Sequence, residues 1–164
     1  MSDKFIRQLT KQDIPESVDV IRTSFLTVGK EFDITPENAP MYTAYSTDES
    51  KILFWMDEQH RPMYGYFADG KLVGYYNLAF VSEVECELGS LCVLPEYRHD
   101  GVGEALLNDS IARAKKLGYA IMNLSIVEEN TVLRKWYEKH GFTHVGTKKF
   151  DFFPFTCGYM VKEL

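Results

Sequence analysis

The sequence predicts a mixed α/β (α+β) domain in which helices flank a single mixed, mostly antiparallel sheet. Three observations lead to this fold class: segments typical of strands, apolar stripes at helical spacing, and the order in which these segments follow one another. A strand and a helix come first. A β-meander follows, and its last strand begins a β-α-β-α-β-β run, unlike a doubly wound fold. A length of 164 residues, 45% of them apolar, predicts one domain over residues 1–164.

The first two elements are a short strand and an amphipathic helix. Phe5–Gln8 has the composition of a strand, and Thr10 is placed as a helix N-cap with Asp13 three residues later, as in a capping box. The apolar stripe of the helix comprises Ile14, Val18, Ile21 and Phe25. We therefore expect a helix with one buried face.

The segment from Leu26 to His60 follows no long period, because Pro36, Pro40 and scattered acids interrupt it. A short helix around Lys51–Met56 is indicated. Such a segment either covers a binding site or is simply irregular, and the pattern leaves both interpretations open.

A β-meander is predicted next. Met63–Ala68 and Lys71–Phe80 flank Asp69-Gly70, the strongest short hairpin signal. Val84–Val93 is the third strand. Its alternation places Val84, Cys86 and Leu88 on one face and Glu85, Glu87 and Gly89 on the other.

The second half of the chain alternates helices and strands. A helix over about residues 101–117 is stopped by Gly118, and Tyr119–Val127 reads as a buried strand. A second helix, Thr131–His140, starts after Asn130. The last two strands are predicted at Phe142–Phe150 and Phe155–Val161.

Charge and cysteine content narrow the partners. The net charge of −6 repels phosphate backbones, so we expect no nucleic-acid partner. The three cysteines include no Cys-x-x-Cys pair, and the four histidines form no His-Glu-x-x-His, so we expect no disulfide framework and no metal. No signal peptide or long apolar run is visible, which predicts a cytoplasmic protein without a membrane span.

The stretch from Val93 to Leu106 carries the most informative motif. It reads Val-Leu-Pro-Glu-Tyr-Arg-His-Asp-Gly-Val-Gly-Glu-Ala-Leu, so a strand runs into a loop whose glycines open a helix. The first N–H groups of a helix can bind phosphate oxygens, and Arg98 adds a charge that can pair with phosphate. The spacing excludes a dinucleotide fingerprint and a Walker loop.

Two motifs together resemble the GNAT N-acetyltransferase family. Arg-x-x-Gly-x-Gly after the Val-x-Pro-Glu-Tyr strand end is similar to the acyl-CoA loop of the family. Asn130 followed by Tyr-Glu-Lys-x-Gly-Phe at residues 137–142 is similar to its second signature. The resemblance is firm over about Val73–Phe150. It implies a GNAT-like fold, an acyltransferase, and acetyl-CoA (or another acyl-CoA) as the cofactor.

The resemblance also implies which residues contact this cofactor. The loop and the start of its helix would hold the pyrophosphate, mainly through backbone N–H groups. The strand end would pair with the pantetheine arm, and Asn130 would face the pantetheine or nucleotide arm. The implied cofactor-binding residues are Leu91, Cys92, Val93, Arg98, His99, Asp100, Gly101, Val102, Gly103, Glu104, Ala105 and Asn130. Asp100 departs from the family pattern, because it places an acid beside the phosphates. Either this acid weakens the affinity for the cofactor, or its side chain points away from the phosphates.

The implied catalytic residues are Glu85, Glu87 and Tyr137. An amine is mostly protonated at neutral pH, so a carboxylate must take its proton before attack, and either glutamate fits. N–H groups of Leu91–Val93 could hold the oxyanion, and Tyr137 could protonate the leaving thiolate. No cysteine has a placed histidine, which favours direct transfer.

The acceptor site is implied to lie between residues 26–60 and 148–159. Both segments are rich in aromatic residues, with acids close by at Glu31, Asp33, Asp48, Glu49 and Asp151. This composition suits a cation, so we expect a small-molecule amine as the acceptor, although the rings could instead fill the core or a homodimer interface. A protein or peptide acceptor, or a catalytically silent acyl-CoA-binding module, are the alternatives.

Overall fold

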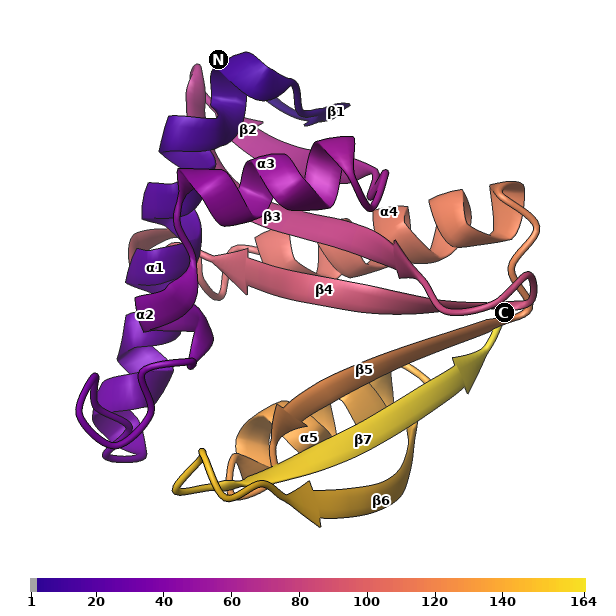
Figure 1. Ribbon diagram of the computed structural model, residues 1–164. Coiled ribbons are helices and arrows are strands. Elements are labelled where there is room, and N and C mark those ends of the chain that lie inside the picture. Colours follow the sequence, from indigo (N-terminus) through magenta and orange to yellow (C-terminus); the bar gives the residue numbers. More distant parts are fainter. Residues whose placement is uncertain (1–2) are drawn as a thin grey trace.

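A seven-stranded sheet in the order β1-β2-β3-β4-β5-β7-β6 runs through the whole molecule (Figure 1). The structure, a computed structural model, describes residues 3–164. The strands are β1 Lys4–Gln8, β2 Met63–Ala68, β3 Lys71–Phe80, β4 Glu85–Val93, β5 Ile121–Val127, β6 Thr143–Lys149 and β7 Thr156–Glu163. Within the described residues only β4 and β5 are parallel neighbours, which confirms the predicted mixed, mostly antiparallel sheet.

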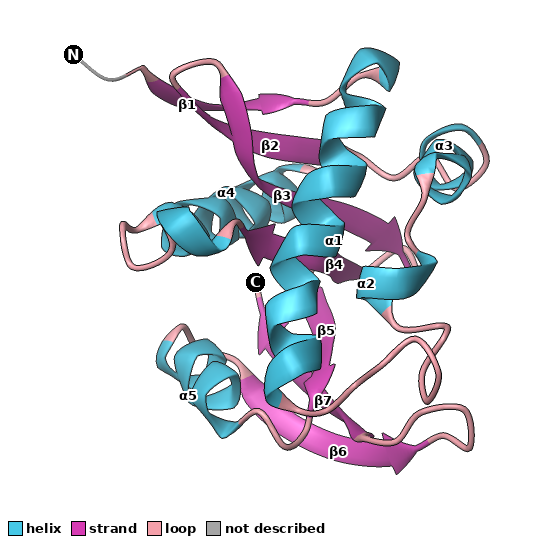
Figure 2. Ribbon diagram, turned by 90° about the vertical axis from the view of Figure 1, so that its left-hand side faces the viewer, coloured by secondary structure: helices cyan, strands magenta, loops and turns pink. Residues whose placement is uncertain are grey.

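Helices cover both faces of this sheet. The α-helices are α1 Ile14–Glu31, α2 Thr43–Ser46, α3 Glu49–Asp57, α4 Val102–Lys116 and α5 Thr131–Lys139, and short 3₁₀ turns lie at Lys11–Asp13 and Pro95–Tyr97. The helices α1 and α4 both pack on β3 and β4, and the two views place them on opposite faces (Figures 1 and 2). Ile21, Tyr75 and Leu106 are fully buried between these layers. The core therefore sits at the centre of the N-terminal half of the sheet.

The predicted hairpin signal sets the register of β2 and β3. Asp69 and Gly70 have φ values of 50° and 82°, the left-handed conformation that a two-residue hairpin turn requires. Ala68 accordingly pairs with Lys71. Because the turn chemistry is local, this part of the fold follows directly from the sequence.

The strands β4 and β5 pair over only three residues each and then part. Glu85–Glu87 lie opposite Ile121–Asn123, and the register ends there. Beyond this point β5 pairs only with β7, along its whole length. Figure 1 shows the two strands diverging toward α1 and α2. The sheet is thus split into two halves, and unpaired backbone of both strands faces the wedge between them.

Two details differ from the sequence-based expectations. The pattern missed α2, because a four-residue helix is too short to show a period. Val84 was expected on one strand face with Cys86 and Leu88, but it lies before the first residue of β4 and is 54% exposed, whereas Cys86 and Leu88 are buried. Within residues 3–164 no helix is both long and apolar enough to span a membrane. Residues 1 and 2 of the predicted domain lie outside the described residues.

Candidate active site

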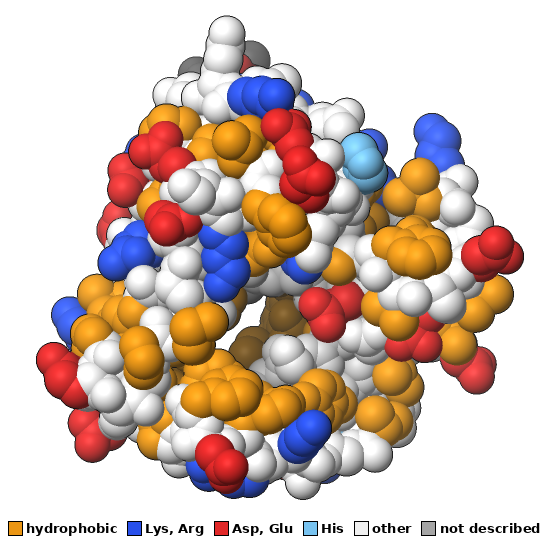
Figure 3. Space-filling model, viewed as in Figure 1, with side chains coloured by type: hydrophobic (Ala, Val, Ile, Leu, Met, Phe, Trp, Pro, Cys, Tyr) orange, Lys and Arg blue, Asp and Glu red, His pale blue; other side chains and the backbone are white. Residues whose placement is uncertain are grey.

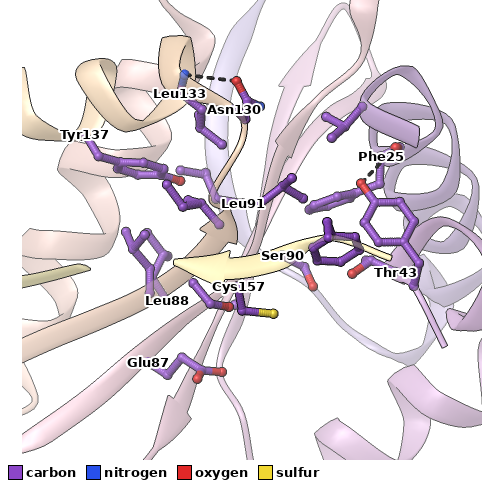
Figure 4. Close-up of a pocket in the computed structure, with 18 of the residues that line it drawn as sticks. Phe25, Thr43, Glu87, Leu88, Ser90, Leu91, Asn130, Leu133, Tyr137 and Cys157 are labelled. Carbon is purple, nitrogen blue, oxygen red and sulfur yellow. Dashed lines mark hydrogen bonds between the residues drawn. The ribbon is translucent and has the colours of Figure 1, made fainter. Parts of the chain in front are cut away.

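A cleft of about 320 Å³ lies where β4 and β5 diverge (Figure 4). Its walls come from four parts of the chain: α1 to the start of β2, the end of β4, β5 with α5, and the β6–β7 connection. The lining residues are Phe25, Val28, Tyr42, Thr43, Trp55, Arg61, Glu87, Leu88, Gly89, Ser90, Leu91, Leu124, Ser125, Ile126, Val127, Asn130, Leu133, Tyr137, Phe153, Phe155 and Cys157. Figure 3 shows a hollow at the centre of the face that carries α3, with charged side chains above it and apolar ones below.

A β-bulge distorts β4 beside the cleft. On β3, Tyr76 faces two residues of β4, Ser90 and Leu91, where the register shifts. Ser90 has a φ of 51°, which is uncommon for a non-glycine residue. A side chain at Gly89 would collide with the amide of Asn77, so this position leaves room for the buried Asn77 side chain. Pairing with β5 ends at Glu87, so the edge of β4 at Ser90 and Leu91 that faces the wedge has no strand partner, and backbone groups on this edge are available to a ligand.

The structure separates the two candidate bases. Glu85 accepts a 2.6 Å hydrogen bond from Asn123 Nδ2 and does not line the cleft. Glu87 lines the cleft and is half-buried. Burial raises the pKa of the Glu87 carboxyl, and the positive charge of Arg61 partly opposes that rise. A carboxylate with a raised pKa in a cleft suits a general base.

Tyr137 reaches the same cleft from α5. Its ring packs on Trp136 and Phe142, with centroid distances of 5.0 and 5.5 Å. Figure 4 shows the hydroxyl directed into the cleft toward the strand that carries Leu91. Burial raises the pKa of Tyr137, so the hydroxyl keeps its proton at neutral pH. The arrangement places a proton donor and a carboxylate in one cavity, on opposite sides of the wedge.

The glycine loop forms the start of α4. Gly101 is the N-cap with φ 82°, and the first residue of the helix is Val102. A Cβ atom at Gly101 would meet nothing within 4 Å, and one at Gly103 would lie 3.7 Å from the Trp136 ring. Because the first N–H groups of a helix have no intrahelical acceptor, they face this open space unpaired. The loop therefore fits phosphate oxygens through its backbone, as the resemblance implies.

The side chain of Arg98 is held within the protein. Its guanidinium donates to Val93 O at 3.0 Å, to Thr27 Oγ1 at 2.9 Å and to Ser24 O at 2.9 Å. These bonds connect α1 to the end of β4, directly before the glycine loop. Arg98 thus positions the loop, and direct pairing with phosphate would have to use the donors that remain.

The other residues of the implied cofactor site fall into three groups. Asn130 lines the cleft and caps α5, its Oδ1 accepting a hydrogen bond from Leu133 N at 3.2 Å. Cys92 and Val93 are buried at the end of β4. Around the α4 N-terminus, the side chains of His99, Asp100 and Glu104 are exposed, and Ala105 N donates to Gly101 O. The structure thus places Asn130 on the β5–α5 half of the wedge and the rest of the predicted set on the β4–α4 half.

The two segments expected to form the acceptor site do line the cleft. The first contributes Val28, Tyr42, Thr43 and Trp55, and the second Phe153, Phe155 and Cys157. The predicted acids do not, because Glu31, Asp33, Asp48, Glu49 and Asp151 are all exposed elsewhere. Arg61 lines this end of the cleft and was missed, because a single arginine before a proline carries no sequence signal.

These two segments also touch each other across the cleft. Tyr42 meets Phe155 edge-on, with ring centroids 5.8 Å apart, and Phe153 stacks on Phe155 at 4.6 Å. The Tyr42 hydroxyl donates to Phe25 O at 3.2 Å. This second apolar cluster joins the α1–α2 region to the β6–β7 connection. It closes part of this side of the cleft.

Among the described residues, no three His, Cys, Asp or Glu side chains gather as a metal site would require.

The model of the Acetyltransferase (GNAT) family matches residues 31–142. An uncharacterised N-acetyltransferase of Mycobacterium bovis is 26% identical over 117 residues, which cover 71% of this chain and 75% of that protein.

Two further matches, one by sequence and one by structure, come from Thermoplasma acidophilum. Spermidine N(1)-acetyltransferase is 34% identical over 88 residues, 54% of each chain. The crystal structure of PaiA N-acetyltransferase in complex with coenzyme A superposes with a TM-score of 0.73 and 23% identity, covering 99% of each chain.

Proposed function

Because the chain belongs to the GNAT acetyltransferase family, we propose that it transfers an acetyl group from acetyl-CoA directly to the primary amine of a small molecule. The family assignment makes the chain an acyltransferase with acetyl-CoA as its cofactor, as the sequence motifs predicted. The acceptor class and the catalytic residues are the parts that we propose. The wedge between β4 and β5 is the site.

Acetyl-CoA supplies an activated acyl group as a thioester. The open backbone at Gly101, Val102 and Gly103 would hold its pyrophosphate, and Leu91 and Asn130 would contact its pantetheine arm. The fit rests on unpaired donors and on the space that a Cβ atom at Gly101 would occupy.

Glu87 is the proposed general base. It lines the cleft with a raised pKa, whereas Glu85 is held by Asn123 outside it. Glu87 would take the proton of the acceptor ammonium, directly or through water. Amides of the bulge at Ser90 and Leu91 would stabilise the negative charge on the acyl oxygen. Tyr137 would return a proton to the departing sulfur.

Direct transfer is favoured over a cysteine-bound acyl enzyme. Burial raises the pKa of Cys86 to about 11 and that of Cys92 to about 12. Both thiols would therefore stay protonated at neutral pH, and a thiol is a poor nucleophile.

The observation that supports a small acceptor is the contact between Tyr42 and Phe155. A peptide acceptor needs a groove that is open along its length, and this contact bridges the groove. The whole cleft, which must also admit the pantetheine arm, has a volume of about 320 Å³ and leaves room for a small acceptor only.

Thiol release from acetyl-CoA, measured with a panel of small amines, spermidine and peptides with free N-termini, tests the proposal. We expect turnover with small amines and little with peptides, and mass spectrometry should find the acetyl group on nitrogen. Faster turnover with peptides would reject the small acceptor. Tight coenzyme A binding without turnover of any acceptor would instead identify a silent binding module.

A further inference from the structure

We propose that the acceptor carries a carboxylate next to its amine, as an apolar or aromatic amino acid does, and that Arg61 binds this carboxylate. The inference rests on the proposed function and names its substrate class. It starts from the charges of the cleft, where the lining residues include one acid, Glu87, and one cation, Arg61. A zwitterion matches such a pair, whereas a polyamine would bring several positive charges to one carboxylate and one guanidinium.

The guanidinium of Arg61 is positioned but not neutralised. It lies over the Trp55 ring, 4.8 Å from the centroid, and the Arg61 backbone N–H donates to Trp55 O at 2.9 Å. Nε donates to Gln59 Oε1 at 2.8 Å and Nη1 to Asn77 Oδ1 at 3.3 Å. All of these partners are neutral. Arg61 forms no ion pair with any of residues 3–164.

Donors therefore remain for a ligand. A guanidinium has five N–H groups, and the two side-chain hydrogen bonds use two of them. A half-buried charge is stabilised by an opposite charge, and the planar guanidinium matches a carboxylate with two parallel bonds. Glu87 is near enough to influence the pKa of Arg61 but does not pair with it directly. The two groups are thus free to bind the two ends of one small zwitterion.

The remainder of the acceptor side is apolar. Phe25, Tyr42, Phe153 and Phe155 line it together with Trp55, which predicts an apolar or aromatic body for the acceptor. Lys51 adds a second positive charge near Trp55, with Nζ 5.7 Å from the ring centroid, but it does not line the cleft. Burial lowers the pKa of the Lys51 ammonium, and the charge of nearby Asp48 partly opposes this shift. We therefore expect Arg61 rather than Lys51 to meet the acceptor carboxylate.

The test compares matched acceptors that differ by the carboxylate. L-phenylalanine, L-leucine and L-methionine are each paired with the amine left after decarboxylation, and kcat/KM is measured at saturating acetyl-CoA. For at least one pair we expect the amino acid to be favoured about tenfold or more, because a site built around a charged donor rejects analogues that lack its partner. Equal or better turnover of all three amines would overturn the inference while leaving the proposed function intact.

Variants assign the preference to Arg61. Arg61→Gln should reduce the ratio of the two kcat/KM values to about one, chiefly through a higher KM for the amino acid, and Arg61→Lys should restore part of it. Lys51→Gln removes the other positive charge that lies near the Trp55 ring, and it should leave the ratio unchanged. An unchanged ratio in Arg61→Gln, or an equal loss in Lys51→Gln, would contradict the assignment.

Calorimetry provides a readout that does not depend on turnover. In the presence of coenzyme A, the preferred amino acid should bind the unmodified protein about tenfold or more tightly than it binds Arg61→Gln. Equal affinities would overturn the inference. If no acceptor is turned over but this difference in binding is found, the proposed function fails and the carboxylate site stands.

Discussion

At the level of single residues, Glu85 and Glu87 differ in their surroundings although both lie on one face of β4. Asn123 holds Glu85 with a 2.6 Å hydrogen bond, whereas Glu87 lines the cleft. Glu87→Gln should lower kcat by about 10²–10⁴, the usual contribution of a general base. Glu85→Gln, which also removes one carboxylate from the same strand face, should cost much less.

The expected pH profile of kcat/KM follows from the direction in which burial shifts the pKa of Glu87. The base must be ionised to accept a proton, and burial raises the pKa of Glu87 above the usual value of about 4.3. The acid limb of kcat/KM should therefore lie above that pH, with activity rising as the carboxyl ionises, and this limb should disappear in Glu87→Gln. If the limb is retained in Glu87→Gln but lost in Glu85→Gln, the two roles are reversed.

A tyrosine pair separates proton donation from stability. Tyr137→Phe should lower kcat by about tenfold or more and change the KM for acetyl-CoA less, because the hydroxyl acts on the leaving group. Tyr76→Phe is the control, since its hydroxyl donates to Asp109 Oδ2 at 2.6 Å away from the cleft. It should lower the melting temperature and preserve kcat. Full activity of Tyr137→Phe would remove this residue from the mechanism.

At the level of elements, the glycine loop before α4 can be tested with a matched turn. Gly101 and Gly70 both have φ 82°, and a Cβ atom at either would meet nothing within 4 Å. Valine at either position therefore costs a similar strain, about 1–2 kcal/mol. Calorimetry should show coenzyme A binding lost in Gly101→Val and retained in Gly70→Val. Equal affinities in both variants would mean that the loop does not bind the cofactor.

The elements themselves followed largely from local patterns. The hairpin at Asp69-Gly70 and the helix that ends before Gly118 need left-handed residues, and both glycines adopt positive φ. The apolar stripe of α1 has its two most buried members at Ile14 and Ile21. The short helix indicated around Lys51–Met56 is present as α3, but the rest of the segment after α1 could not be assigned, because its contacts are with residues far away in the sequence, as between Tyr42 and Phe155.

At the level of the whole molecule, Arg98 connects parts of the chain that are more than seventy residues apart, from α1 to the loop before α4. Arg98→Met should lower the free energy of unfolding by about 2–4 kcal/mol without any ligand, because charged hydrogen bonds are lost and buried carbonyls are left unpaired. Denaturant unfolding measures this. Lys139→Met, an exposed control, should change it by less than about 0.5 kcal/mol. If Arg98→Met unfolds like the control, the hydrogen bonds of Arg98 do not stabilise the fold.

The fold class and the order of the elements other than α2 were predicted from the sequence, because capping, turn and periodicity signals belong to contiguous residues. The family was predicted from a resemblance that two contiguous motifs carry. The loop at Arg98–Gly103 is also a contiguous motif, and the structure places it at the start of α4. These features can be predicted without knowing which segments of the chain contact one another in the folded protein.

The cleft depends on the packing of distant segments. Where β4 and β5 part determines that Glu87 lines the cavity while Glu85 does not. The predicted acids turn outward, and Arg61, which has no local signal, lies over Trp55 at one end of the cleft. Each of these outcomes is set by contacts between residues far apart in the chain, because the charge and burial of a side chain depend on what folding brings beside it.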